Sequence, residues 1–275
     1  YKLTAKVVSA NVPAGIRIFE TGTTTIHDTD YIAAGRVIST SFVATTTTTQ
    51  VYLRSAGAGV AVWDNISVKE LSGNHARQTT SASRPILRQN AVTGAYYLEF
   101  DGSDDFLQTN NINFTATDKV SVFAGVRKLS DAVSGALVEL SVNAVNNDGT
   151  FAVFTPGTAT LTTFRAYSRG TIVSSNNGAL TAPAPNSFVG TAFTQISTDT
   201  NKIRIDGVDR SSVSTDQGAG NYGNYPLYIG RRAGTTHPFN GHIYGLIGVG
   251  RLAADNETAA IEKELAKRTG VALSV

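Results

Sequence analysis

The sequence predicts an all-β protein made of antiparallel β-sandwiches, with one short α-helix near its C-terminal end. Short segments alternate between apolar and polar residues, and clusters of threonine, glycine, asparagine and serine separate them. Helical spacing is confined to one segment near the end. Many short alternating segments with frequent turn residues are typical of antiparallel sandwiches. The abundant threonine fits, because a β-branched residue with a hydroxyl suits the solvated face of a sheet.

The alternating segments are expected to be strands. In chain order they are 2–8, 15–19, 50–54, 61–68, 96–100, 120–126, 151–154 and 202–206. The threonine run 45–49 lies between Phe42 and Val51, whose surroundings keep strand character. We therefore expect a threonine-rich strand or hairpin there rather than a disordered linker.

The segment 254–268 is expected to be the helix. Its apolar residues recur at helical spacing, acidic residues lie near its start, and basic residues lie near its end, as the helix dipole favours. The apolar residues are Ala260, Ile261 and Leu265, the acidic residues are Asp255 and Glu257, and the basic residues are Lys263, Lys267 and Arg268. Gly270 stands where a left-handed C-terminal cap is expected.

Composition and charge exclude several classes of protein. The chain has 275 residues, a net charge of +2 and only 16% charged residues. No basic run is longer than a pair such as Arg231-Arg232, whereas nucleic-acid binders concentrate basic residues in a stripe. Nucleic acid is therefore not an expected partner. No apolar stretch approaches the length of a membrane span, so membrane insertion is not expected.

The chain contains neither cysteine nor methionine. The lack of cysteine excludes disulfides, thiolate zinc sites, thiol catalysis and iron–sulfur clusters. Because the sequence opens at Tyr1 without a start residue, we expect a processed product or a fragment of a longer polypeptide. A domain boundary is expected within 71–74, where an alternating segment gives way to a polar one. This predicts two domains, residues 1–71 and 72–275.

The second domain carries a series of short motifs. They are Gly73-Asn74-His75-Ala76 with Gln78-Thr79-Thr80 and Arg84-Pro85, the segment 98–107, Ile203-Arg204-Ile205-Asp206-Gly207-Val208, the segment 227–231, the segment 239–243 and the closing helix. Their order and spacing resemble those of laminin-G-like, concanavalin A-like domains in phage and bacterial proteins. The segment 98–107 resembles the family's hairpin of the form FDG…D…L. The resemblance implies a concanavalin A-like sandwich.

The first domain ends in the segment 60–71, which resembles the last strand of carbohydrate-binding-module jelly rolls. Such modules are longer than 71 residues, so the resemblance implies that the opening strands are missing. Either a preceding region or another chain would complete the sheet, since an open sandwich has an edge that is prone to pairing.

The motifs that resemble catalytic or cofactor sites lack the local context that their chemistry needs. Related glucanases place acids in an E-x-D-x-x-E arrangement, and the closest match is Glu99, Asp101 and Asp104. However, Asp101-Gly102 is a turn sequence, which would end the strand before a third acid could align. The segment 218–223 matches G-x-G-x-x-G but leads into a strand, not a helix, so no dinucleotide site is expected. The histidines His27, His75, His237 and His242 do not cluster as zinc ligands. No catalytic residue is predicted.

Two binding sites are predicted. The residues Asn221, Tyr222, Asn224 and Tyr225 combine aromatic rings with amides, as sugar binding requires, and are the predicted carbohydrate site. Trp63 is a second candidate, interpreted instead as a core residue. Asp104, Asp105 and Asp148 offer oxygen ligands for calcium, which laminin-G-like folds often hold. Because asparagine, aspartate and glycine also make turns, we weigh the turn interpretation above the metal and keep Ca²⁺ as an alternative cofactor.

These observations and the resemblance predict a bacteriophage virion-surface or tail-fibre protein, without enzymatic activity, that binds host-surface polysaccharide. One alternative is a purely structural virion component, and a second is an accessory module of a secreted carbohydrate-active bacterial protein. Other virion proteins are expected partners, and a homo-oligomer such as a trimer would cover exposed edges. The expected location is the virion surface or the extracellular space.

Overall fold

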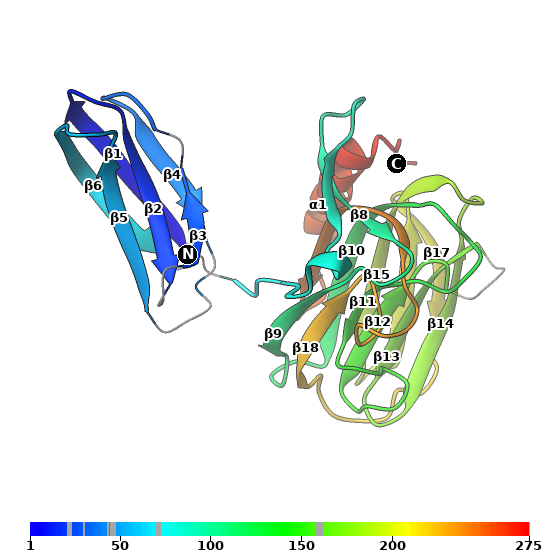
Figure 1. Ribbon diagram of the computed structural model, residues 1–275. Coiled ribbons are helices and arrows are strands. Elements are labelled where there is room, and N and C mark those ends of the chain that lie inside the picture. The colour runs from blue at the N-terminus through cyan, green and yellow to red at the C-terminus, as the bar shows by residue number, and fades with distance from the viewer. Residues whose placement is uncertain are drawn as a thin grey trace. The chain divides into compact units, whose positions relative to one another are not determined.

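The computed structural model describes residues 1–20, 24–29, 31–42, 44, 48–69, 73–157 and 162–274. The chain divides between Gly73 and Asn74 into two compact units, which are described separately (Figure 1). Leu71 and Ser72, at the expected boundary, lie outside the described residues.

The first unit consists of two three-stranded antiparallel sheets, in the orders β4-β1-β6 and β3-β2-β5. The strands are β1 (Lys2–Ala10), β2 (Ala14–Glu20), β3 (Thr24–Asp28), β4 (Val37–Ser41), β5 (Thr49–Ser55) and β6 (Ala61–Lys69). Every second residue of a strand points into the core of this unit, so both sheets contribute side chains: Leu3 and Ala5 from β1, and Ile16 and Ile18 from β2. Trp63 is half-buried and packs against this core, as expected.

The threonine run is only partly described. Thr49 begins β5, whereas residues 45–47 lie outside the described residues. The predicted strand character therefore holds at the end of the run that adjoins Val51.

The second unit is a sandwich of two antiparallel sheets (Figure 1). A seven-stranded sheet has the order β17-β16-β15-β10-β19-β8-β7, and a six-stranded sheet has the order β14-β13-β12-β11-β18-β9. The strands are β7 (Ile86–Gln89), β8 (Tyr96–Asp101), β9 (Leu107–Asn113), β10 (Lys119–Lys128), β11 (Ala136–Leu140), β12 (Thr150–Phe154), β13 (Thr163–Arg169), β14 (Val173–Leu180), β15 (Asn186–Gln195), β16 (Thr200–Ile205), β17 (Val208–Val213), β18 (Asn224–Ile229) and β19 (Asn240–Val249). A 3₁₀ turn, η1 (Ser81–Ser83), precedes β7. The all-β fold class is confirmed.

Phenylalanine dominates the core between these sheets. Phe100 and Phe188 project from the seven-stranded sheet, and Phe151 and Phe164 project from the six-stranded sheet. Fully burying such a side chain stabilises the fold by about 1.5–3 kcal/mol. Phe164 and Phe188 meet edge to face across the two sheets, with ring centroids 5.8 Å apart.

The helix α1 (Asp255–Thr269) closes the unit, and Gly270 caps it in the left-handed conformation, as predicted. It packs on β10, β15 and β19. A Cβ atom at Gly245 would lie 2.6 Å from Leu265 Cδ2, so this glycine lets the helix approach the sheet closely. Ala260, however, is exposed, and the buried face includes Glu262 instead. Among the described residues, no helix has the length and apolar character that a membrane crossing requires.

The two aspartate–glycine turns differ. Asp206-Gly207 joins β16 to β17 as a two-residue hairpin with positive φ at both positions, as predicted. The segment 98–107, in contrast, is not a hairpin, because β8 belongs to the seven-stranded sheet and β9 to the six-stranded sheet. The turn after Asp101 carries the chain from one sheet to the other, which a local sequence pattern cannot distinguish from a hairpin.

Candidate functional site

The structure places Tyr222 in the core, so its prediction as a sugar-stacking residue is wrong. Its side chain is 1% exposed, and its ring meets Phe151 edge to face at 5.5 Å. Its hydroxyl lies 2.7 Å from the hydroxyls of both Ser168 and Thr194. Burial raises the pKa of Tyr222 to about 12. Neither face of this ring can reach a ligand.

The other residues of the predicted carbohydrate site stay nearer the surface. Asn221 is exposed, and its amide donates a hydrogen bond of 2.8 Å to the Thr115 carbonyl. Asn224 is exposed at the start of β18. Tyr225 is half-buried, and its hydroxyl donates to the Asp148 carbonyl at 3.2 Å. The loop thus offers amides beside one partly covered ring.

The predicted calcium ligands fall in two places. Asp148 pairs with Arg169 at 2.9 Å and does not join the other acids. Asp104 and Asp105 lie with Asp101 in the turn between β8 and β9, and their nearest carboxylate oxygens are within 4.8 Å of one another. Asp101 was interpreted from the sequence only as a turn residue.

Hydrogen bonds within this acidic turn fix its carboxylates. Asp101 Oδ1 accepts from the Ser103 amide at 2.8 Å, and Asp105 Oδ2 accepts from the Asp101 amide at 3.0 Å. Ser83 Oγ donates to Asp104 Oδ2 at 2.6 Å. Burial raises the pKa of Asp105, and the neighbouring Asp101 and Asp104 charges add to that effect. A hard cation would relieve this repulsion, and the oxygen-only ligand set fits one.

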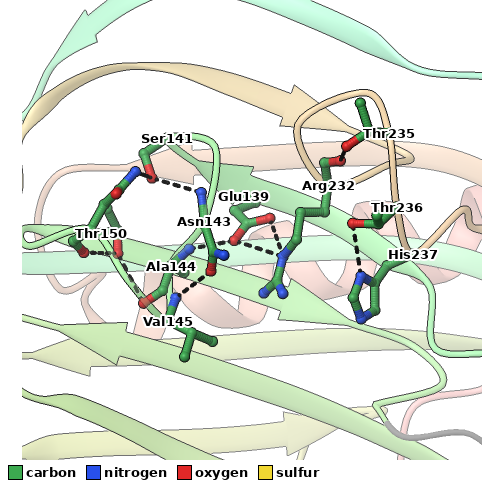
Figure 2. Close-up of polar contacts among 11 residues, drawn as sticks. Glu139, Ser141, Asn143, Ala144, Val145, Thr150, Arg232, Thr235, Thr236 and His237 are labelled. Atoms are coloured by element: carbon green, nitrogen blue, oxygen red, sulfur yellow. Dashed lines mark hydrogen bonds and ion pairs between the residues drawn. The ribbon is translucent and has the colours of Figure 1, made fainter.

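A buried ion pair stands on the outer face of the six-stranded sheet (Figure 2). Glu139 on β11 is 0% exposed, and Arg232 Nε lies 3.1 and 2.9 Å from its two carboxylate oxygens. The Ala144 amide also donates to Glu139, at 2.6 Å. Burial raises the pKa of Glu139 although Arg232 opposes the shift. Since Arg232 bonds both oxygens, this carboxylate anchors the loops that cover the sheet.

A separate surface pocket lies where β8 parts from β19. The β8–β19 ladder ends at Leu98 opposite Ile243, whereas β8 continues to pair with β7 as far as Tyr96 opposite Gln89. A pocket of about 230 Å³ occupies this fork. Its lining is Leu87, Tyr96, Tyr97, Leu98, Leu107, Ile229, Ile243, Tyr244, Gly245 and Leu246, and we call it the fork pocket.

Three tyrosines shape the fork pocket. Tyr96 is 61% exposed, so most of its ring can be reached from solvent. Tyr97 stacks on His242 with ring centroids 4.2 Å apart and lies 5.0 Å from the Tyr244 ring. Asn90 donates to the Tyr244 hydroxyl at 3.1 Å, which fixes that ring.

Polar groups border the fork pocket on the outer face of the seven-stranded sheet. Glu99 lies 3.4 Å from Arg88 and 3.8 Å from His242 Nε2. Burial lowers the pKa of His242, although Glu99 opposes that shift, so the imidazole is neutral at pH 7. Its Nδ1 has no hydrogen-bond partner among the described residues. Glu99, Arg88 and His242 are not part of the lining, which consists of the tyrosine rings and apolar residues.

Sequence reasoning missed the fork pocket, although one local pattern points to it. Two adjacent tyrosines, Tyr96 and Tyr97, place one ring on each face of a strand, so one of them must face away from the core. The segment 96–100 was interpreted only as a strand. Tyr244 and His242 come from β19, and nothing in the sequence places them beside β8.

Together these features define an antiparallel two-sheet β-sandwich with an aromatic pocket where two strands of one sheet part. No family model and no curated protein matches the chain. Among solved structures, the chain is similar to the CBM40 of Ruminococcus gnavus IT-sialidase bound to α2,3-sialyllactose, at 16% identity over 57% of this chain and 98% of that one, with a TM-score of 0.42.

Two further solved structures are similar. A heptameric SAP-like pentraxin from Limulus polyphemus shows 8% identity over 62% of this chain and 82% of that one, with a TM-score of 0.49. A structure of botulinum neurotoxin type C, a toxin whose cell entry depends on interaction with two ganglioside molecules, shows 12% identity over 66% of this chain and 45% of that one, with a TM-score of 0.48. At these identities the likeness concerns the fold alone.

Proposed function

We propose that this protein is a non-enzymatic carbohydrate-binding protein and that its second unit holds a sugar ring in the fork pocket. The observation that carries the proposal is the set of three tyrosines around one open pocket of about 230 Å³. The C–H faces of a sugar pack on aromatic rings, while planar polar groups bond its hydroxyls. Within the lining, the hydroxyls of these three tyrosines are the side-chain groups that can bond sugar hydroxyls, whereas Glu99, Arg88 and His242 lie outside it.

A binding role fits this pocket better than a hydrolytic one. Glycoside hydrolysis uses two carboxyl groups that flank the scissile bond. The described lining of the fork pocket contains no carboxylate, and the neighbouring Glu99 pairs with Arg88. The proposal therefore assigns no catalytic residue.

The proposed setting is the virion surface or a tail fibre of a bacteriophage, where the protein would bind host polysaccharide as a homo-oligomer alongside other virion proteins. The order of the motifs in residues 72–275 supports this setting. The alternatives are a structural virion component and an accessory module of a secreted bacterial protein. A structural virion component would not bind glycan, so a glycan-binding measurement distinguishes it from the proposed function.

The first test is binding of the full chain to a panel of bacterial surface polysaccharides. Tyr96→Ala is expected to weaken saturable binding by about tenfold, because a sugar loses its exposed stacking face. Tyr225→Ala is the matched control, since it removes a tyrosine from the loop in which the sequence predicts the carbohydrate site. Equal losses in both variants would contradict the fork pocket as the site. Absence of binding to every glycan would favour a structural virion component.

Calcium is the proposed cofactor, held by Asp101, Asp104 and Asp105. Millimolar Ca²⁺ is expected to raise the melting temperature of the second unit by a few degrees, because a ligand that binds only the folded state stabilises it by mass action. EDTA should reverse the shift, and Asp104→Asn should abolish it. Asp148→Asn is the control and should keep the shift. Calorimetry that shows no shift in the unmodified chain would exclude calcium at this turn.

A further inference from the structure

A second, larger pocket lies between α1, the turn joining β16 to β17, and the segment that follows the helix. Its volume is about 520 Å³, within the range of about 300–1,000 Å³ usual for small-molecule sites. The lining is Arg204, Gly207, Ala259, Glu262, Lys263, Ala266, Lys267, Val271 and Leu273. We call it the helix pocket.

One side of the helix pocket is apolar and fixed. Ala259 and Ala266 come from α1, and Val271 and Leu273 come from the segment after it. The Val271 amide donates to the Ala266 carbonyl at 3.1 Å, and the Ser274 amide donates to the Asp206 carbonyl at 3.0 Å. Because both ends of this segment are hydrogen-bonded, the apolar wall is part of the fold.

The floor of the helix pocket is an ion pair whose charges are already satisfied. Glu262 is 2% exposed and accepts hydrogen bonds from Arg204 Nε at 2.9 Å and Thr191 Oγ1 at 2.8 Å. Arg204 also donates to Asp209, at 2.6 Å. Because Glu262 and Arg204 pair with each other, their charges largely cancel. They therefore define the shape of the pocket and do not determine which sign of ligand charge it binds.

The rim, in contrast, carries uncompensated positive charge. Lys263 and Lys267 lie four residues apart on α1, so they project from the same side of the helix. Both are exposed, and neither forms an ion pair with a described carboxylate. An apolar wall beside two unpaired ammonium groups is complementary to a molecule with an apolar body and an anionic head.

We propose that the helix pocket binds a small anionic amphiphile, a carboxylate with a medium-length hydrocarbon body. The carboxylate lies between the ammonium groups of Lys263 and Lys267. The hydrocarbon lies against Ala259, Val271 and Leu273 and loses its contact with water. This site is separate from the fork pocket and does not depend on sugar binding there.

The test is titration of the full chain with decanoate, followed by calorimetry. Lys263→Gln/Lys267→Gln is expected to weaken binding by about tenfold, since two exposed charge interactions are lost. Ala259→Leu is expected to weaken it at least as much, because the larger side chain fills the pocket. Ala260→Leu and Arg268→Gln are the matched controls, as both positions are exposed on the same helix outside the lining, and both should bind decanoate normally.

Neutral decanol tests the anionic head group separately from the apolar body. It should bind at least tenfold more weakly than decanoate, and acetate, which lacks the apolar body, should not bind measurably. Equal affinity for decanol and decanoate would overturn the proposed head group. Absence of decanoate binding, or equal weakening by Ala259→Leu and Ala260→Leu, would overturn the site itself.

Discussion

Arg232→Ala is expected to lower the free energy of unfolding of the second unit by about 3–5 kcal/mol at pH 7, because it leaves a buried carboxylate without its counter-ion. Glu139 is 0% exposed, and Arg232 bonds both of its oxygens. The variant also removes the guanidinium that lies 5.0 Å over the Phe154 ring. Urea unfolding followed by circular dichroism would measure the loss.

The loss should depend on pH in a defined direction. Burial already raises the pKa of Glu139 above its ordinary value of 4.5, and removal of Arg232 raises this pKa further. The folded variant then binds the proton more tightly than the unfolded chain, so its stability falls as pH rises from about 4.5 through the raised pKa. The deficit of Arg232→Ala should therefore be smaller at pH 5 than at pH 7.

Two further variants isolate the origin of this effect. Glu139→Gln keeps an acceptor for the Ala144 amide and removes the buried charge, so it should cost less than Arg232→Ala. Measured against Glu139→Gln, which also lacks this carboxyl, the double variant Glu139→Gln/Arg232→Ala should show none of this pH dependence. If it persisted, neighbouring His237, whose pKa burial and the Arg232 charge lower, would be its source. A single variant Arg232→Ala as stable as the unmodified chain would refute the role of the pair.

Local patterns predicted the secondary structure well, because alternation and helix capping are properties of neighbouring residues. The strands around Val122 and Ile203 and the cap at Gly270 all form as expected. The same patterns failed to predict which sheet a strand joins, because that depends on tertiary structure. Asp101-Gly102 reads locally as a hairpin turn, but the chain changes sheets there. Phe100 before this turn and Ile205 before the Asp206-Gly207 hairpin both pack in the same core, so the residues next to the turn do not distinguish the two outcomes.

The candidate sites show the same limit. The acidic turn could be found in part because Asp104 and Asp105 are adjacent, whereas Asp148 was grouped with them by residue type alone and lies apart. The fork pocket depends on where the β8–β19 ladder stops. That end point arises from packing between strands that are far apart in sequence, so no spacing rule could locate it.

Substitution of Tyr222 is expected to have the second large effect on the stability of the second unit. Tyr222→Ala is expected to destabilise the second unit by about 3–5 kcal/mol, since it removes a fully buried ring from the core. Tyr222→Phe should cost about 1–3 kcal/mol, because it keeps the ring but leaves the hydroxyls of Ser168 and Thr194 without their shared partner. Urea unfolding of both variants would measure these losses and their order.

This order matters for any test of sugar binding. A glycine- and asparagine-rich loop suggests an exposed ring, but the Tyr222 amide donates to the Thr117 carbonyl at 2.9 Å and its side chain lies in the core beside Phe151. Loss of glycan binding in Tyr222→Ala would therefore report unfolding rather than a lost contact. Tyr222→Phe separates the two explanations, because it should remain folded at 25 °C and bind glycan with unchanged affinity. Weakened glycan binding at unchanged stability in Tyr222→Phe would instead return the binding site to the loop.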